Sequence, residues 1–339
     1  FGLYSFDLFE HIYKEAWDLE VEKGANVFTR EGEQIPLTNT YKTKEELIRD
    51  IPRLIIENNI HGIDIDPRAV QIAGLSLWLR AQKNWNDQKI KNSDRPVIRK
   101  GNIVCAEPMP GEVDMLKEFA SSLKPRVLGQ LLEQIFDKMK LAGEAGSLLK
   151  IEEEIQETVD KAREEFSKEL LQRKSQEEFL PGVDMGREIT LFDFTDLPDK
   201  TKFWDTAEDS IIKALKDYAE HSETQSSLRH RLFAEDAAKG FAFIDICRKR
   251  YDVVLMNPPF GEYPYSYREI ASSEYTSGSH DIIAGFIERT ISFKNLNGLI
   301  GCISSRAVFF GSTNSRWREL VIIPNGLRIW SELGTGVLD

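Results

Sequence analysis

Short apolar runs alternate along this chain with longer stretches of helical periodicity. The short runs lie at 60–65, 253–255 and 299–304, and the helical patterns lie at 3–19, 67–79 and 281–293. The short runs predict buried strands, because they are too brief for helices and contain β-branched residues. Strand, helix and strand in that order favour parallel pairing through a crossover helix. The pattern therefore predicts an α/β fold.

The middle of the chain has a different pattern. Apolar residues at 128, 132, 135, 136 and 139 follow helical spacing, glycines interrupt it at 143–146, and apolar positions then recur from 151 to 170 in steps of four and three. Two such helices joined by a short break predict a long antiparallel helical hairpin. A loop with a short strand is predicted at 184–199 and another helix at 205–220. We expect a mainly helical insertion, 106–240, between two parts of one core, 1–105 and 241–339.

The sharpest chemical signal follows the apolar run at 253–255. That run ends in four residues, Asn257, Pro258, Pro259 and Phe260. The two prolines have no backbone N–H and hold φ near −65°, and Asn257 before a proline is driven into an extended conformation. A stiff loop with an amide, fixed carbonyls and an aromatic face is expected at the end of a strand. Such a sequence is also a common turn initiator, so only its context favours a functional role.

This set of groups suits the activation of a planar amine. The lone pair of an exocyclic amine is delocalised into its ring, which makes the nitrogen a poor nucleophile. The Asn257 side-chain oxygen and the Pro258 carbonyl would each accept one N–H and draw the nitrogen towards sp3 geometry, while Phe260 would stack on the base. Preorganised acceptors of this kind act on charge that develops in the transition state.

A second motif lies upstream, in the residues Gly62 to Pro67 that read GIDIDP. Asp66 is a good N-cap residue and Pro67 stands at the favoured first helical position. An acidic residue at the carboxyl end of a parallel strand is placed to bind ribose hydroxyls, which makes Asp64 the candidate. Two alternatives stay open here: both aspartates cap the helix, or the motif serves a nicotinamide-dependent dehydrogenase.

Together, GIDIDP and NPPF resemble motifs II and IV of S-adenosylmethionine-dependent amino-methyltransferases, particularly DNA adenine-N6 enzymes of the gamma motif order. The flanking runs, Ile51–Leu54, Gly62–Ala81 and Glu332–Val337, are similar to the large restriction-type methyltransferases, including the PglX-like enzymes of BREX phage defence. The resemblance covers about residues 1–105 and 241–339. It implies a Rossmann-like methyltransferase sheet and the cofactor S-adenosyl-L-methionine.

The resemblance also implies roles for individual residues. Asp64 and the adjacent Ile65 would bind the cofactor, and Asn257 to Phe260 would hold the target adenine. Arg99–Ile103 is similar to motif III, so Asn102 and Ile103 would contact the cofactor adenine, although the family often has Asp where Asn102 stands. Ala284–Glu288 is similar to motif V, with Phe286 packing on the cofactor adenine. The implied partner is duplex DNA with a flipped adenine, in restriction-modification or phage defence.

The chain departs from the family pattern at both ends. The glycine-rich loop of motif I would precede the helix at 3–19, yet the sequence opens at Phe1–Tyr4 without it. That loop normally lets backbone amides approach the cofactor closely. Motif VIII and a DNA-recognition domain would follow residue 339. We therefore expect a fragment that is inactive alone and binds the cofactor weakly, from a parent with a partner subunit or a fused nuclease or recognition domain.

Composition limits the kinds of site and the cellular location that we expect for this protein. The 339 residues include three scattered cysteines, five histidines without metal-ligand spacing and no apolar run long enough to cross a membrane. We expect a cytoplasmic protein without a metal site. The net charge of −12 is unusual for a DNA enzyme, but ten acidic and five basic residues between 151 and 180 account for part of it. The basic groups at 248–250 and 306–318 would face either a nucleic acid or solvent.

Other functions use the same residues. An RNA base methyltransferase or a protein-glutamine methyltransferase would present the same acceptors to its substrate, because an amide NH2 poses the same chemical problem. A dehydrogenase would have no use for the NPPF loop. A non-catalytic scaffold would retain the methyltransferase fold without its activity. The stretch 261–280 is predicted to be a polar, flexible loop able to close over an extruded nucleotide.

Overall fold

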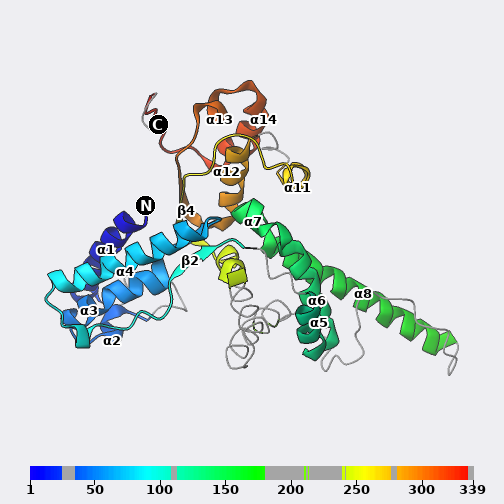
Figure 1. Cartoon of the computed structure of the whole chain (residues 1–339), viewed down its shortest axis with the longest axis horizontal. Helices are drawn as coiled ribbons and strands as arrows, with labels where there is room; N and C mark the ends of the chain where they lie inside the picture. The colour runs from blue at the N-terminus through cyan, green and yellow to red at the C-terminus, as the bar shows by residue number, and fades with distance from the viewer. Residues whose placement is uncertain are drawn as a thin grey trace. The chain divides into compact units, whose positions relative to one another are not determined.

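The computed structural model describes residues 1–24, 35–107, 113–179, 210, 213, 239–240, 242–275 and 281–334 (Figure 1). The loop expected at 184–199, and all but two residues of the helix expected at 205–220, lie outside these residues. The chain divides into two compact units, which are described separately. Unit 1 comprises residues 1–146 and 151–246, and unit 2 comprises residues 147–150 and 247–339.

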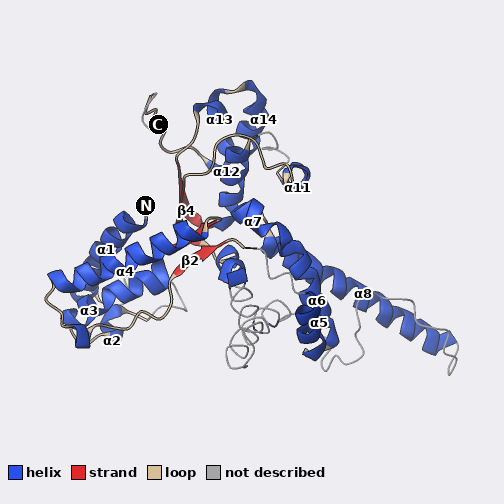
Figure 2. Cartoon of the chain, viewed as in Figure 1, coloured by secondary structure: helices blue, strands red, loops and turns tan. Residues whose placement is uncertain are grey.

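Unit 1 is mainly helical, with two short strands (Figure 2). Its elements are α1 (Gly2–Lys23), α2 (Leu37–Thr40), α3 (Lys44–Leu54), the π-helix η1 (Ile55–Asn59), β1 (His61–Asp64), α4 (Pro67–Asp87), the 3-10 turn η2 (Asn92–Asp94), β2 (Asn102–Cys105), α5 (Val113–Ser122), α6 (Arg126–Lys138), the 3-10 turn η3 (Met139–Leu141), α7 (Ala142–Ala145) and α8 (Ile151–Phe179). The 3-10 turn η4 (Gly146–Leu148) leads from unit 1 into the four residues that belong to unit 2.

The core of unit 1 lies among α1, α3 and α4, which contact one another in pairs (Figure 1). Its buried side chains are Phe6, Trp17, Leu47, Ile51, Ile55, Ile56, Ile60, Leu77, Ala81 and Trp85. Trp85 is fully enclosed, and its indole N–H donates to the carbonyl of Arg49 on α3 at 2.8 Å. A buried indole needs such a partner, so this bond fixes the ring as well as satisfying its donor.

A partly buried charged cluster connects α3 to its neighbours. Asp50 accepts hydrogen bonds from Arg53 at 2.7 Å and from the Tyr41 hydroxyl at 2.6 Å. Burial acts to raise the pKa of the Asp50 carboxyl, but these two donors outweigh burial and hold the pKa below its usual value. Arg53 also donates to Glu57 at 2.9 Å, and Glu57 accepts the backbone N–H of Arg99 at 2.7 Å. The cluster thus ties η1 to the segment that leads into β2.

The helical hairpin predicted for the middle of the chain is present as α6 and α8, which contact each other. Five apolar residues that set the predicted stripe on α8 are all buried: Ile151, Ile155, Val159, Ala162 and Phe166. An ion pair from Lys138 to Glu154, at 2.7 Å, links the two helices. A further helix, α5, was not predicted, and it packs on α6 where a side chain at Gly129 would overlap the Ala120 carbonyl.

Unit 2 contains a parallel strand pair and the helix between its strands. Its elements are β3 (Tyr251–Met256), α11 (Arg268–Glu274), α12 (Ile282–Phe293), β4 (Lys294–Cys302), α13 (Arg306–Phe310), the 3-10 turn η5 (Ser312–Asn314), α14 (Ser315–Trp317), the π-helix η6 (Arg318–Ile322) and α15 (Ile323–Asn325). The strands align Met256 with Cys302, so their carboxyl ends coincide. The strand predicted at 299–304 begins earlier, at Lys294, with an irregularity opposite Tyr251 and Val253.

The fold class is confirmed at its coarse level. Helices follow strands, and both strand pairs are parallel, β1 with β2 and β3 with β4. In the described residues these strands form two separate two-stranded sheets rather than one Rossmann-like sheet. No helix among these residues has both the length and the apolar character that a bilayer crossing requires.

Candidate active site

The NPPF loop lies where the sequence predicted it, directly after the last residue of β3. Pro258 is buried, whereas Asn257, Pro259 and Phe260 are exposed, with 55% of the Phe260 surface accessible. Neither the Asn257 carboxamide nor the Pro258 carbonyl bonds to any other residue that the structure describes. Both acceptors are therefore open, on a backbone that the prolines stiffen.

The end of β3 is held from two sides. The Ile303 N–H after β4 donates to the Met256 carbonyl at 3.1 Å, which continues the strand pairing to the residue before Asn257. The Thr290 hydroxyl on α12 contacts the Met256 sulfur at 3.3 Å. Helix α12 also carries Phe286, which is half-buried. The structure thus places NPPF and Phe286 on neighbouring elements of one unit.

The stretch after Phe260 differs from the flexible loop that we predicted. The Gly261 carbonyl accepts the Ile282 N–H at 3.1 Å, and Asp281 caps α12 by accepting the Ile283 N–H at 2.9 Å. Tyr263 is buried against α12, where its hydroxyl fills the space that a side chain at Gly285 would need. The prediction was wrong because the polar composition of this stretch hides buried tyrosines whose hydroxyls find partners. Residues 276–280 lie outside the described part.

Two more tyrosines of this stretch hold residues 147–150. Tyr267 and Tyr275 are fully buried, and their hydroxyls lie 3.0 and 2.6 Å from the Leu148 carbonyl. The buried guanidinium of Arg289, on α12, donates to the carbonyls of Ser147 at 2.9 Å and Leu149 at 3.4 Å. Three consecutive carbonyls are therefore bound by side chains that follow NPPF in the sequence. No sequence pattern signalled this, because the partners lie over 100 positions apart.

In unit 1, the two aspartates of the GIDIDP motif make different contacts. Asp66 caps α4 by accepting the Arg68 N–H at 2.9 Å, and hydrogen bonds from the Arg68 side chain and backbone lower the pKa of Asp66. Asp64 is exposed at the end of β1, and one of its oxygens accepts the Asp66 N–H at 2.8 Å. Its other oxygen makes no hydrogen bond to a described residue. Ile65 beside it is also exposed, at 55% of its surface.

The structure places Asn102 away from Asp64, at the opposite end of the β1–β2 ladder. Asn102 pairs with His61 at the amino end of the β1–β2 ladder, whereas Asp64 pairs with Cys105 at the carboxyl end. The Asn102 amide is buried and donates to the carbonyls of Ile56 at 3.4 Å and Glu57 at 2.6 Å. These bonds anchor the start of β2 to η1. The predicted contact of Asn102 with the cofactor adenine stays a prediction.

Ile103 also serves the strand pair rather than the carboxyl end. It aligns with Gly62, and its side chain lies against the face of that glycine, so closely that a methyl group on Gly62 would require a shift. The residue that reaches the carboxyl end beside Asp64 is Cys105. Burial, followed by the neighbouring Glu107, raises the pKa of its thiol to about 11. Glu107, just beyond β2, was not singled out from the sequence, because the strand before it was not predicted.

Among the described residues there is no cluster of three or more His, Cys, Asp or Glu side chains that could hold a metal ion. Within the two motifs, open polar atoms are offered by the acceptors of Asn257 and Pro258 in unit 2 and by the Asp64 carboxylate in unit 1. The first pair suits the N–H bonds of an amine. The carboxylate suits a pair of hydroxyls, with the apolar Ile65 beside it.

Comparison with known proteins gives a consistent result. The family model "Eco57I restriction-modification methylase" matches residues 58–329, a span that contains both GIDIDP and NPPF. The "Adenine-specific methyltransferase BrxX" of Escherichia coli O9:H4 (strain HS) is 22% identical over 285 residues, which is 80% of this chain and 20% of that protein. The chain thus spans about a fifth of the length of this relative. The resemblance drawn from the two motifs is confirmed: the chain belongs to the Eco57I restriction-modification methylase family.

Proposed function

We propose that this protein transfers a methyl group from S-adenosyl-L-methionine to the N6 of adenine in duplex DNA, in restriction-modification or phage defence. The observation that carries the proposal is the pair of open acceptors, Asn257 and Pro258, at the end of β3. The family match and the similarity to the adenine-specific methyltransferase BrxX support an adenine substrate. A site-specific DNA enzyme would need a recognition element in addition to this core, supplied by a partner subunit or a further domain.

The acceptor loop acts by geometry rather than by proton abstraction. The side-chain oxygen of Asn257 and the Pro258 carbonyl accept the two N6 hydrogens and hold them out of the ring plane, which localises the lone pair on nitrogen. The exposed ring of Phe260 stacks on the adenine, which fixes its position and offsets part of the cost of flipping it from the duplex. Because both acceptors are held by a strand end and two prolines, little reorganisation is needed when the amine enters.

The residues present fit the cofactor in two places. The free oxygen of Asp64 suits the ribose hydroxyls, and the exposed Ile65 offers an apolar surface to the adenine ring. Phe286, on α12, would pack on that ring as well. When bound, the cofactor supplies an electrophilic methyl group on a sulfonium. We also propose that residues 1–105 and 241–339 together form one methyltransferase core with a Rossmann-like sheet. Residues 106–240 would then be an insertion in that core.

The test is methyl transfer by the protein in its natural sequence context, with duplex DNA, RNA and a glutamine-containing peptide as acceptors. Asn257→Ala should abolish transfer to DNA, because one of two amine acceptors is lost. It should leave cofactor affinity and the unfolding temperature unchanged, because the side chain is exposed and makes no hydrogen bond within the described chain. The matched control is Asn297→Ala, an exposed asparagine in β4 remote from the strand end. Transfer to RNA or peptide but not to DNA, or full activity of Asn257→Ala, would overturn the proposal.

A further inference from the structure

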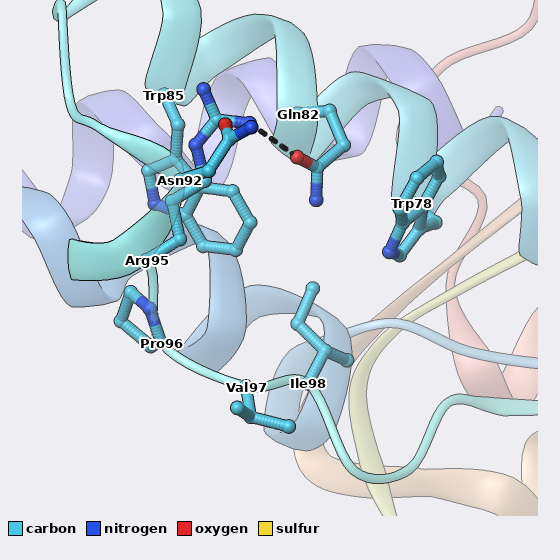
Figure 3. Close-up of a pocket in the computed structure, with 8 residues that line it drawn as sticks. All are labelled: Trp78, Gln82, Trp85, Asn92, Arg95, Pro96, Val97 and Ile98. Atoms are coloured by element: carbon cyan, nitrogen blue, oxygen red, sulfur yellow. Dashed lines mark hydrogen bonds between the residues drawn. The ribbon is translucent and has the colours of Figure 1, made fainter.

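A pocket of about 410 Å³ lies in unit 1 between α4 and the segment that follows it (Figure 3). We call it the Trp78 pocket. It is lined on the α4 side by Trp78, Gln82 and Trp85, and on the facing segment by Asn92, Arg95, Pro96, Val97 and Ile98. Figure 3 shows the two indoles and the Gln82 amide on one side of the cavity, with Ile98 and Val97 across from them. Nothing in the GIDIDP or NPPF motifs contributes to this lining.

The walls of the Trp78 pocket are fixed before any ligand enters. The Trp85 ring is buried, with its N–H bonded to the Arg49 carbonyl. The Arg95 guanidinium lies over that ring, 5.9 Å from its centroid, and donates to the Gln82 carboxamide oxygen at 2.6 Å. Arg95 also donates to the Ile90 carbonyl at 3.1 Å. A pocket with such bonded walls loses little entropy on binding, which favours a specific ligand over a nonspecific apolar contact.

The open groups of the pocket suit a flat ring that carries hydrogen-bond acceptors. Trp78 has 47% of its surface exposed, so about half of the residue is accessible to a stacking ligand. The Gln82 oxygen is occupied by Arg95, which leaves the amide N–H groups as donors. The opposite wall is apolar, made by Pro96, Val97 and Ile98. A nucleobase has this combination of flat faces and edge acceptors, and stacking on an aromatic side chain tolerates any base.

The charge around the pocket identifies the polymer that would carry the base. Between residues 80 and 100 the sequence has seven Lys or Arg and only two Asp or Glu, in a chain whose net charge is −12. Lys83, Lys89 and Lys91 are exposed and form no ion pair with any other residue that the structure describes. The partners of Arg95 there are all uncharged, so its positive charge is uncompensated. A basic surface around a stacking pocket favours a phosphodiester strand.

We propose that the Trp78 pocket binds an unpaired base of a nucleic acid strand, with the surrounding lysines neutralising the adjacent phosphates. This site shares no residue with the acceptor loop at Asn257 and does not depend on the proposed methyl transfer. It would hold a base outside a duplex without acting on it chemically. An aromatic side chain of a protein is the competing occupant, and the absence of any oligonucleotide binding would favour it over a nucleic acid strand.

The test measures binding of a fluorescein-labelled oligothymidylate of about twelve nucleotides by anisotropy, beside an abasic oligomer with the same backbone and a blunt duplex. Trp78→Ala should weaken oligothymidylate binding by about tenfold, as expected for the loss of one base–aromatic stack, and Trp78→Phe should restore most of it. Leu75→Ala is the matched control, because Leu75 is exposed on α4 but does not line the pocket. Trp78 is half-exposed, and circular dichroism verifies that the variants fold.

The outcomes separate the alternatives. Lys91→Ala should flatten the dependence of affinity on salt concentration, because one phosphate contact is lost. Equal binding of the abasic oligomer, equal binding of the duplex, or unchanged binding by Trp78→Ala would overturn the proposal, as would the absence of oligonucleotide binding at about 0.1 M salt. Loss of methylation in Asn257→Ala with unaltered oligothymidylate binding would show that base binding at the Trp78 pocket is independent of methyl transfer at the acceptor loop.

Discussion

The two tyrosines that meet at the Leu148 carbonyl allow a double-mutant experiment. Tyr267 and Tyr275 are both fully buried, and both hydroxyls lie within hydrogen-bond distance of that one oxygen. The Tyr267 hydroxyl also lies 2.8 Å from the Glu274 carboxylate. A hydroxyl has a single proton, so Tyr267 donates to one of these acceptors at a time. The carbonyl can therefore lose either tyrosine and keep a donor, but it cannot lose both.

The expected magnitudes follow from this arrangement. Tyr275→Phe should cost about 1 kcal/mol of unfolding free energy, since Tyr267 can turn its proton to Leu148. Tyr267→Phe should cost about the same, because Tyr275 still donates to the carbonyl. In the double variant the buried carbonyl has no donor left, and that penalty adds about 1–3 kcal/mol. The double variant should thus be less stable than the sum of the singles by at least about 1 kcal/mol.

Urea unfolding followed by circular dichroism measures these free energies, with Tyr265→Phe as control. Tyr265 lies in the same stretch but has 91% of its surface exposed, so its hydroxyl should contribute nothing measurable. Strict additivity of the two single variants, within about 0.3 kcal/mol, would show that Leu148 does not depend on both hydroxyls. That result would refute the interpretation of residues 147–150 as a segment held by these side chains.

Three further predictions test other contacts. Gly285→Ala should destabilise the protein by about 1–3 kcal/mol because the new methyl group overlaps the Tyr263 hydroxyl, and Tyr263→Phe in the same chain should recover part of the loss in urea unfolding. Gly129→Ala should lower the unfolding temperature by forcing α5 from α6, whereas Gly74→Ala, in α4 with open space around it, should raise it slightly. Because the pKa of Asp50 is lower in the folded protein, its carboxylate stabilises the fold above about pH 4, its unfolded pKa. This stabilisation is lost as the pH falls through the folded pKa. Asp50→Asn should therefore make the unfolding temperature fall less steeply between pH 7 and 3.

Features governed by local chemistry were predictable from the sequence. The cap and first turn of α4 follow from Asp66 and Pro67, and the structure shows both in those positions. The position of Asn257 at a strand end follows from the prolines after it. The buried stripe on α8 follows from its spacing, since each expected residue through Phe166 is enclosed. In each case the signal and the structure it determines lie within a few residues of each other.

Features set by distant pairing were not predictable. The alignment of β2 with β1 puts Asn102 opposite His61 and so at the amino end, a register that no spacing within either segment reveals. The tyrosines after NPPF looked like a polar surface loop because their partners are backbone carbonyls around Leu148, which are invisible in the sequence. The short strands carry too few residues to predict their partners, so the sheet is the least readable part of the fold.

The bonds around residues 147–150 bear on the purpose of the long interruption between the two motifs. These four residues lie inside the expected insertion, 106–240, yet they belong to unit 2. Arg289 binds two of their carbonyls, and it lies one turn beyond Phe286 on α12. The same helix contacts Met256, the residue before Asn257, so residues 147–149 anchor the helix that packs against the end of β3. If residues 106–240 are an insertion, as we propose, it is more than an addition to a finished core, because four of its residues belong to unit 2, bind the buried guanidinium of Arg289 and hold α12 beside the NPPF loop.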